Sequence, residues 1–220
     1  RSYIREGRWE KIYNTLQPGD FVLLQFGHND ICPINDKKER GVIPGTADTC
    51  HVYKMEKDGR FEVVYSFGWY LKKMIDDCRE KGATPILVSL TPRNEWPNGK
   101  IERRNGSYGK WYREVVKETG VELVDVHNIS ADFLDRIGRE KAKAYYNHDH
   151  THTSLTGAKM NAKSVAKGLM RNNSSLAKYL ISSTTIVEDM SKRDPKNNDP
   201  FIYSAELPDG NYKVTVVLGS

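Results

Sequence analysis

Two polar segments far apart in the sequence carry side chains that suit acyl transfer. Gly27-His28-Asn29-Asp30 follows the apolar run 21–26, and Asp149-His150-Thr151-His152 precedes an expected helix. An Asn at a strand end can donate an N–H to a developing oxyanion, and a glycine before it allows a sharp turn. His152 can serve as a general base that Asp149, three residues earlier, orients. The sequence therefore predicts most of a site for attack on an ester, although no serine lies in a recognisable nucleophile turn.

Each motif alone is common, so two other interpretations stay open. His148, His150 and His152 alternate, and on an extended strand their imidazoles would share one face and could bind zinc in a metal-dependent hydrolase. The chain could also be a non-catalytic carbohydrate-binding protein that stacks aromatic rings on sugars. The candidate aromatic residues are Trp69, Trp96, Trp111, Tyr108 and Tyr112. At helical spacing, the last three are more often core residues.

Composition indicates a folded domain. Of the 220 residues, 38% are hydrophobic and 29% are charged, which argues against disorder. No run of about 18 apolar residues occurs, so we expect no membrane contact through a spanning helix. The net charge of +5 is small and favours a solvated basic surface over a nucleic-acid partner. The chain opens on Arg1 without a signal peptide, and it ends within an expected strand, so we interpret it as a fragment.

The periodicity of apolar residues predicts alternating helices and strands. Helices are expected at 6–16, 67–78, 107–119 and 154–171, and a further helix is expected to follow Ser130, its possible N-cap. Strands are expected at 21–26, 84–90 and 121–126. The run 21–26 is continuously apolar, which is typical of a strand buried on both faces. Residues 31–60 form a long polar insertion with a hairpin expected near 50–64. The last helix is expected to bury one stripe, made of Leu155, Ala158, Ala162, Val165, Ala166 and Leu169.

This alternation predicts an α/β fold with three layers, in which helices cover both faces of a parallel sheet. Ligands of such sheets bind at the carboxyl ends of the strands. The segments 27–30 and 91–94 both follow expected strands, so we expect them at the same rim.

The character of the chain changes after Lys178. We expect a first domain at 1–178, a polar linker at 179–200, and the start of a β-rich domain at 201–220, where two apolar runs flank Pro208-Asp209-Gly210-Asn211.

Three cysteines leave the redox compartment open. Cys32 and Cys50 flank one polar loop and could form a disulfide, which would stabilise the fold by about 3 kcal/mol in chain-entropy terms. Cys78 lies inside an expected helix and is interpreted as a buried thiol.

Taken together, the motifs resemble a known family. Four stretches match in order: 1–9, Gln25-Phe26-Gly27-His28-Asn29-Asp30, 82–92, and the segment from Asp149 to Ala158. They resemble the SGNH (GDSL-type) hydrolases, which have a flavodoxin-like fold, and within them the rhamnogalacturonan acetylesterases. The resemblance covers about residues 1–172.

The resemblance implies a role for each matched residue. Asn29 would be the oxyanion donor, Gly27 would shape its turn, His152 would be the general base and Asp149 its orienter. The family's nucleophilic serine and first two strands would precede Arg1, so the chain should hold three of five parallel strands and be inactive alone. Residues 207–215 resemble a β-sandwich module.

The resemblance also implies a substrate and a location. It indicates a carbohydrate esterase that removes O-acetyl groups from a plant cell-wall polysaccharide, with pectic rhamnogalacturonan as the expected substrate. Catalysis would use Ser-His-Asp chemistry with no metal or organic cofactor. An enzyme that degrades a polymer should be secreted or periplasmic. The oligomeric state and the exact sugar ester are not readable from the sequence.

Overall fold

The computed structural model describes residues 1–180, which form one of two units of the chain. All but the first two residues of the expected linker, and the whole β-rich segment at 201–220, lie outside the described residues. Within residues 1–180, no helix is long and apolar enough to cross a membrane.

A three-stranded parallel sheet runs through the described part of the chain. Its strands are β1 (Phe21–Leu24), β4 (Thr84–Val88) and β5 (Glu122–Val124), in the order β1-β4-β5. Leu24 lies opposite Leu87, and Val88 lies opposite Val124. Each strand is shorter than the apolar run that predicted it. Residues 25–26 and 89–90 lie in the loops after β1 and β4, and Asp125 after β5 is already the N-cap of α5.

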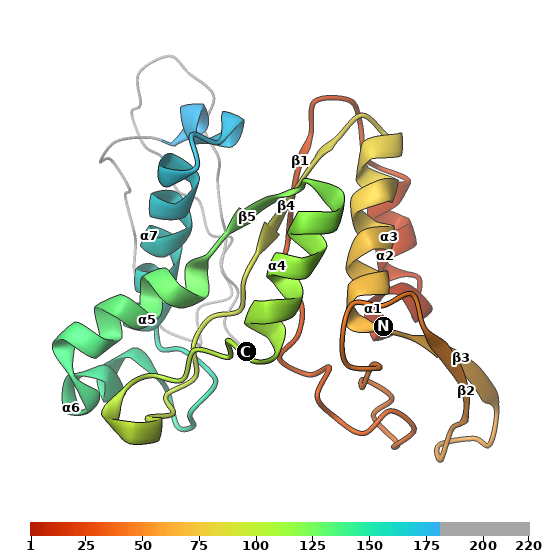
Figure 1. The fold of residues 1–220 in the computed structure, drawn as a ribbon, viewed down its shortest axis with the longest axis horizontal. Helices are drawn as coiled ribbons and strands as arrows, with labels where there is room; N and C mark the ends of the chain where they lie inside the picture. The colour runs from red at the N-terminus through yellow and green to blue at the C-terminus, as the bar shows by residue number, and fades with distance from the viewer. Residues whose placement is uncertain (181–220) are drawn as a thin grey trace, which may run out of the picture. The chain divides into compact units, whose positions relative to one another are not determined.

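Helices cover both faces of the sheet, as predicted (Figure 1). On one side lie α1 (Ser2–Arg5), α2 (Arg8–Tyr13), α3 (Phe67–Glu80) and α4 (Tyr108–Thr119), and on the other α5 (Val126–Ile137) and α7 (Leu155–Arg171). The alternation along β4 explains the three layers. Leu87 packs into the core cluster of α3 and α4, whereas Ile86 and Val88 pack with Leu169 of α7. Short elements complete the fold: α6 (Arg139–Ala142), η1 (Pro97–Gly99), η2 (Lys143–Tyr145) and η3 (Ser175–Tyr179).

The prediction that the run 21–26 is buried on both faces is wrong for the described residues. β1 forms an edge of the described sheet, and Leu23 is 43% exposed. Leu24 and Val22 pack against the side of α3, while β4 occupies the centre of the sheet.

Two helix starts differ from the predictions. The expected helix at 6–16 is two helices, because Gly7 takes a left-handed conformation with φ 69° between them. Ser130 is not an N-cap: Asp125 caps α5 by accepting a hydrogen bond from the N–H of Asn128. Ser130 lies inside α5, fully buried, and its hydroxyl bonds to Ser164 of α7 at 2.8 Å.

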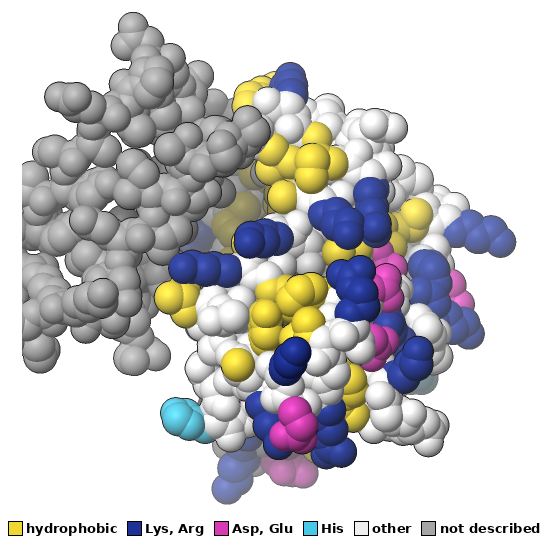
Figure 2. All heavy atoms as spheres, turned by 90° about the vertical axis from the view of Figure 1, so that its left-hand side faces the viewer, with side chains coloured by type: hydrophobic (Ala, Val, Ile, Leu, Met, Phe, Trp, Pro, Cys, Tyr) yellow, Lys and Arg dark blue, Asp and Glu magenta, His cyan; other side chains and the backbone are white. Residues whose placement is uncertain are grey.

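The buried face of α7 was predicted only in part: Leu169 is buried as expected, and Val165 and Ala166 are half-buried. The buried residues of α7 are Gly157, Met160, Ser164, Gly168 and Leu169, whereas Leu155, Ala158 and Ala162 of the expected stripe are exposed. Small residues let the helix approach the sheet, since a Cβ on Gly168 would lie 2.5 Å from Cγ1 of Val124. The opposite face of α7 is exposed at Lys159, Lys163, Lys167 and Arg171. Figure 2 shows this side of the molecule, on which Lys and Arg side chains outnumber Asp and Glu.

The insertion contains the expected hairpin. Strands β2 (Cys50–Lys54) and β3 (Phe61–Tyr65) pair antiparallel, with Val52 opposite Val63. Cys32 and Cys50 are free thiols, so the proposed disulfide between them does not form. Cys78 is fully buried in α3, as predicted, and burial raises the pKa of its thiol to about 11.

Candidate active site

The segment that follows β4 joins the two polar motifs at one rim of the sheet. Nη2 of Arg93 donates to the carbonyl of His28 at 3.2 Å. The next residue, Asn94, donates its backbone N–H to the carbonyl of His150 at 2.7 Å. A third hydrogen bond joins the segments after β1 and β4, because the side-chain amide of Gln25 donates to the carbonyl of Ser89 at 2.7 Å. The loops after β1 and β4 and the loop before α7 therefore form one continuous hydrogen-bonded rim.

The turn that presents Asn29 requires glycine at position 27. Gly27 has φ 140°, a backbone conformation that side chains rarely adopt. A Cβ there would lie 2.9 Å from the ring of buried Tyr108 and 3.1 Å from Leu90. The carbonyl of Gly27 accepts the N–H of Asp30 at 3.2 Å, which closes the turn. Asn29 is exposed at its tip.

A buried tyrosine holds the chain just before this turn. The hydroxyl of Tyr112 accepts the N–H of Phe26 at 3.1 Å and donates to the carbonyl of the same residue at 2.7 Å. Tyr112 is 1% exposed, and burial raises the pKa of its hydroxyl. The sequence predicted Tyr112 only as a core residue, since nothing in its spacing signals a contact 86 residues away.

Asp149 and His152 form the predicted pair within one short turn. Oδ1 of Asp149 accepts the backbone N–H groups of Thr151 and His152, both at 2.7 Å, and Oδ2 lies 2.6 Å from Nδ1 of His152. These hydrogen bonds hold the pKa of the Asp149 carboxyl well below its usual range, and the backbone N–H of His152 contributes most. An ionised carboxylate only accepts, so in the neutral imidazole Nδ1 carries the proton and Nε2 is an acceptor. The side chain of His152 is 78% exposed.

His28 also lies at this rim, although no role was predicted for it from the sequence. Nε2 of His28 is 3.3 Å from Oγ1 of Thr91, while Nδ1 is buried. Burial, followed by the positive charges of Arg104 and Arg93, lowers the pKa of the imidazole to about 4. His28 is therefore neutral across the physiological range. Its position inside the 27–30 motif could have indicated from the sequence that His28 lies at the site.

The alternating histidines have separate partners. Nε2 of His150 is 3.4 Å from Oε1 of Glu95, whereas His152 pairs with Asp149. Within residues 1–180, no three His, Cys, Asp or Glu side chains are arranged to hold a metal ion. The geometry thus gives the zinc interpretation no support.

The aromatic candidates mostly belong to the core. Tyr108 and Tyr112 are buried, and Trp69 and Trp111 pack against the same cluster. Trp96 packs against a second cluster and donates its indole N–H to Oδ1 of Asn94 at 2.8 Å. Within the described residues, no hydroxyl is hydrogen-bonded to His152, so the geometry assigns no nucleophile.

Comparisons with known proteins agree with this fold. The model of the GDSL-like Lipase/Acylhydrolase family matches residues 1–160. A rhamnogalacturonan acetylesterase of Emericella nidulans is 33% identical over 172 residues, which is 77% of this chain and 69% of that protein. The probable rhamnogalacturonan acetylesterase YesY of Bacillus subtilis is 31% identical over 77% of this chain and 70% of that protein.

A solved structure supports the fold. The crystal structure of YxiM from Bacillus subtilis superposes with a TM-score of 0.62 at 23% identity and covers 80% of this chain. The chain spans 43% of the length of that structure. YxiM is named as an uncharacterized esterase, and at 23% identity the likeness supports the fold alone. The matches establish that this chain belongs to the GDSL-like lipase/acylhydrolase (SGNH) family of hydrolytic enzymes, as its motifs predicted.

Proposed function

We propose that this chain provides the acid–base pair and the oxyanion donor of a carbohydrate esterase that removes acetyl groups from pectic rhamnogalacturonan. The observation behind the proposal is the Asp149–His152 pair, whose Nε2 is free to accept a proton at the rim that also presents Asn29. The names of the relatives support the choice of substrate. Because the substrate is a cell-wall polymer, the enzyme acts outside the cytoplasm, by secretion or in the periplasm.

The proposed chemistry follows from the hydrogen bonds. A serine hydroxyl gives its proton to Nε2 of His152 and attacks the acetyl carbonyl, while Asp149 stabilises the imidazolium that forms. The side-chain amide of Asn29 donates to the oxyanion of the tetrahedral intermediate. His152 then protonates the departing sugar oxygen, and water releases acetate from the acyl-enzyme by the same steps in reverse order. No step requires a metal or an organic cofactor.

The test uses protein expressed from its complete reading frame. Acetate release is measured on acetylated rhamnogalacturonan and on acetylated xylan, for the wild type and for Asn29→Ala. We expect faster release from rhamnogalacturonan and a loss on the order of 10² to 10³ in kcat for Asn29→Ala, the usual effect of removing one oxyanion donor. Equal rates on xylan would reject the pectic substrate, and a wild-type rate in Asn29→Ala would remove Asn29 from the site.

A second measurement identifies the nucleophile and separates the enzyme from a carbohydrate-binding protein. A fluorophosphonate probe should label one serine, which peptide mass spectrometry locates, and His152→Ala should abolish labelling because the serine loses its base. A non-catalytic binder would show no labelling in either protein.

A further inference from the structure

One side chain of the insertion reaches the proposed oxyanion donor. Nη1 of Arg40 donates a hydrogen bond to Oδ1 of Asn29 at 3.3 Å. Arg40 is exposed, and among the described residues it forms no ion pair with an acid. A carboxamide has its oxygen on one side and its NH₂ group on the other. With Oδ1 facing Arg40, the two N–H donors lie on the other side of the amide from Arg40.

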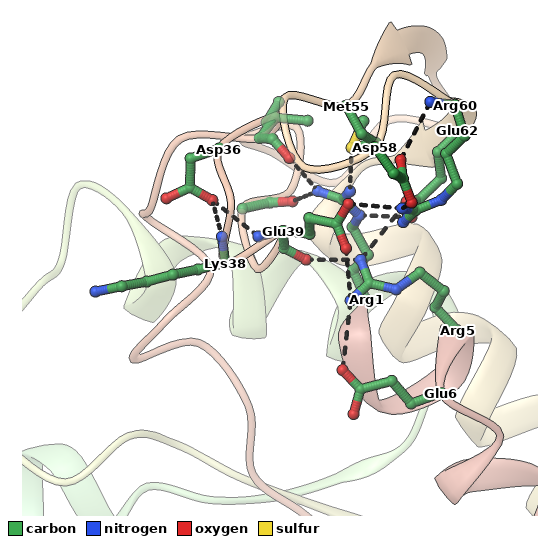
Figure 3. Close-up of polar contacts among 12 residues, drawn as sticks. Arg1, Arg5, Glu6, Asp36, Lys38, Glu39, Met55, Asp58, Arg60 and Glu62 are labelled. Carbon is green, nitrogen blue, oxygen red and sulfur yellow. Dashed lines mark hydrogen bonds and ion pairs between the residues drawn. The ribbon is translucent and has the colours of Figure 1, made fainter.

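The backbone around Arg40 is anchored on both sides. The carboxylate of Glu39 is 3% exposed and lies 2.8 Å from Nη1 of Arg60 and 3.5 Å from Nη2 of Arg5. On the other side of Arg40, the carbonyl of Gly41 accepts a hydrogen bond from Nη1 of Arg1 at 2.8 Å. Figure 3 shows Arg1, Arg5, Glu39 and Arg60 gathered in this ion cluster.

Two close contacts fix the loop further. A Cβ on Gly41 would lie 2.0 Å from the carbonyl oxygen of Cys32, so only glycine fits there. The N–H of Val42 donates to the carbonyl of Asp30 at 3.1 Å, which ties the loop to the residue next to Asn29.

Glu39 adopts a left-handed backbone conformation with φ 52°. This conformation is unfavourable for any residue that has a side chain. Such a conformation persists only where the surroundings hold it, and here the ion cluster does. Arg40 therefore extends toward Asn29 from a fixed base and not from a freely moving loop.

We infer that Arg40 is a positioning residue that fixes the carboxamide of Asn29 with its N–H donors toward the reacting carbonyl. This inference rests on the proposed function. Rotation of an Asn amide about its last torsion is broad and nearly two-fold, so an unheld amide spends part of its time with oxygen toward the oxyanion. That orientation repels the developing charge. A guanidinium on the amide oxygen also polarises the N–H groups and makes them stronger donors.

The expected effect is on turnover. Arg40→Ala should lower kcat about tenfold, less than the 10² to 10³ expected when the donor itself is removed. KM should change little, because the amide acts on the transition state more than on the ground state. Arg40→Lys retains a cationic donor and should recover part of the lost rate.

The experiment is a double-mutant cycle in the protein expressed from its complete reading frame. The wild type, Arg40→Ala, Asn29→Ala and the double variant are assayed on 4-nitrophenyl acetate, a small neutral ester. Arg40→Ala should lower kcat about tenfold when Asn29 is present and have no further effect when Asn29 is replaced. Lys38→Ala is the matched control, since Lys38 is an exposed cation of the same loop whose side chain points away from the ion cluster (Figure 3). It should retain the wild-type rate.

Each other outcome overturns a defined statement. An equal loss from Arg40→Ala in both backgrounds would mean a general structural effect and reject the positioning role. No loss on the neutral ester, with a raised KM on an acidic polymer, would make Arg40 a contact for substrate carboxylates and also reject it. A wild-type rate in Asn29→Ala alone would instead reject the proposed oxyanion role, which is a separate result.

Discussion

The two motifs at the rim are built in opposite ways. The Asp149–His152 pair is closed by three hydrogen bonds within one exposed turn, so neighbours in the sequence provide its geometry. The turn that presents Asn29 depends on residues from elsewhere, above all Tyr112, whose hydroxyl bonds to Phe26 across 86 positions. The first motif should thus tolerate changes in the fold around it, whereas the second should fail when distant core residues are altered.

The largest effect should come from the local motif and be confined to activity. His152→Ala should lower kcat by about 10⁴-fold or more, since the nucleophile loses its base, and Asp149→Asn should fall between this variant and the wild type. The thermal midpoint should stay near that of the wild type, because the side chain of His152 is 78% exposed. Acetate release and thermal unfolding test both statements.

His148→Ala is the control, as an exposed histidine of the same loop. A clear fall in the thermal midpoint of His152→Ala would show that this motif is also part of the packed fold, and the contrast between the motifs would then be wrong.

Gly27→Ala should damage stability and activity together. The new Cβ would lie 2.9 Å from Tyr108 in a backbone conformation with φ 140°. Backbone strain and overpacking together should lower the free energy of unfolding by about 2 to 4 kcal/mol. Urea unfolding measures the change.

Gly45→Ala is the matched control for strain alone, since Gly45 has φ 100° with no atom within 4 Å of an added Cβ. Equal losses in the two variants would mean that the contact with Tyr108 adds nothing.

Tyr112→Phe removes one oxygen from the core and should disturb the rim from a distance. It leaves the N–H and carbonyl of Phe26 without their partner, which should cost about 1 to 3 kcal/mol. The rate should fall as well, because the turn that follows Phe26 loses its support. Tyr145→Phe is the comparison, as Tyr145 packs on Phe133 through its ring. A stable Tyr112→Phe variant with a wild-type rate would reduce Tyr112 to packing.

The smallest expected effect concerns acid stability. Burial lowers the pKa of His28 to about 4, against about 6.5 in an unfolded chain. Between these values the unfolded chain binds a proton that the folded protein does not, so this residue destabilises the fold as the pH falls from about 6.5 to 4. His28→Gln should flatten that part of the stability curve in urea unfolding at pH 7 and 4.5. His51→Gln, on the exposed hairpin, should leave the curve unchanged.

The contrast between the motifs also explains what could be predicted from the sequence. The hydrogen-bonded pairing of Asp149 with His152 could be predicted because the two residues are neighbours in the sequence, and the strands could be predicted because apolar runs mark the centre of a sheet. Tyr112 was missed as a support because its hydroxyl acts across the fold. The buried face of α7 was misread because Gly168 and Ser164 pack by being small, which a search for large apolar residues does not detect. Ser130 has the side chain of an N-cap, and only its position inside α5 shows its contact with Ser164.

The ion cluster of the insertion constrains how this loop can evolve. Glu39 contacts Arg5 and Arg60, and Glu62 contacts Arg1, with most of these charges shielded from water. Loss of one partner from such a cluster leaves a charge uncompensated, which is unfavourable where that charge is buried, as for Arg1 and Glu39. Substitutions at these positions should therefore be inherited in pairs. Across homologues, charge at 39 should covary with charge at 5 and 60, whereas the neighbouring exposed Lys38 should vary freely.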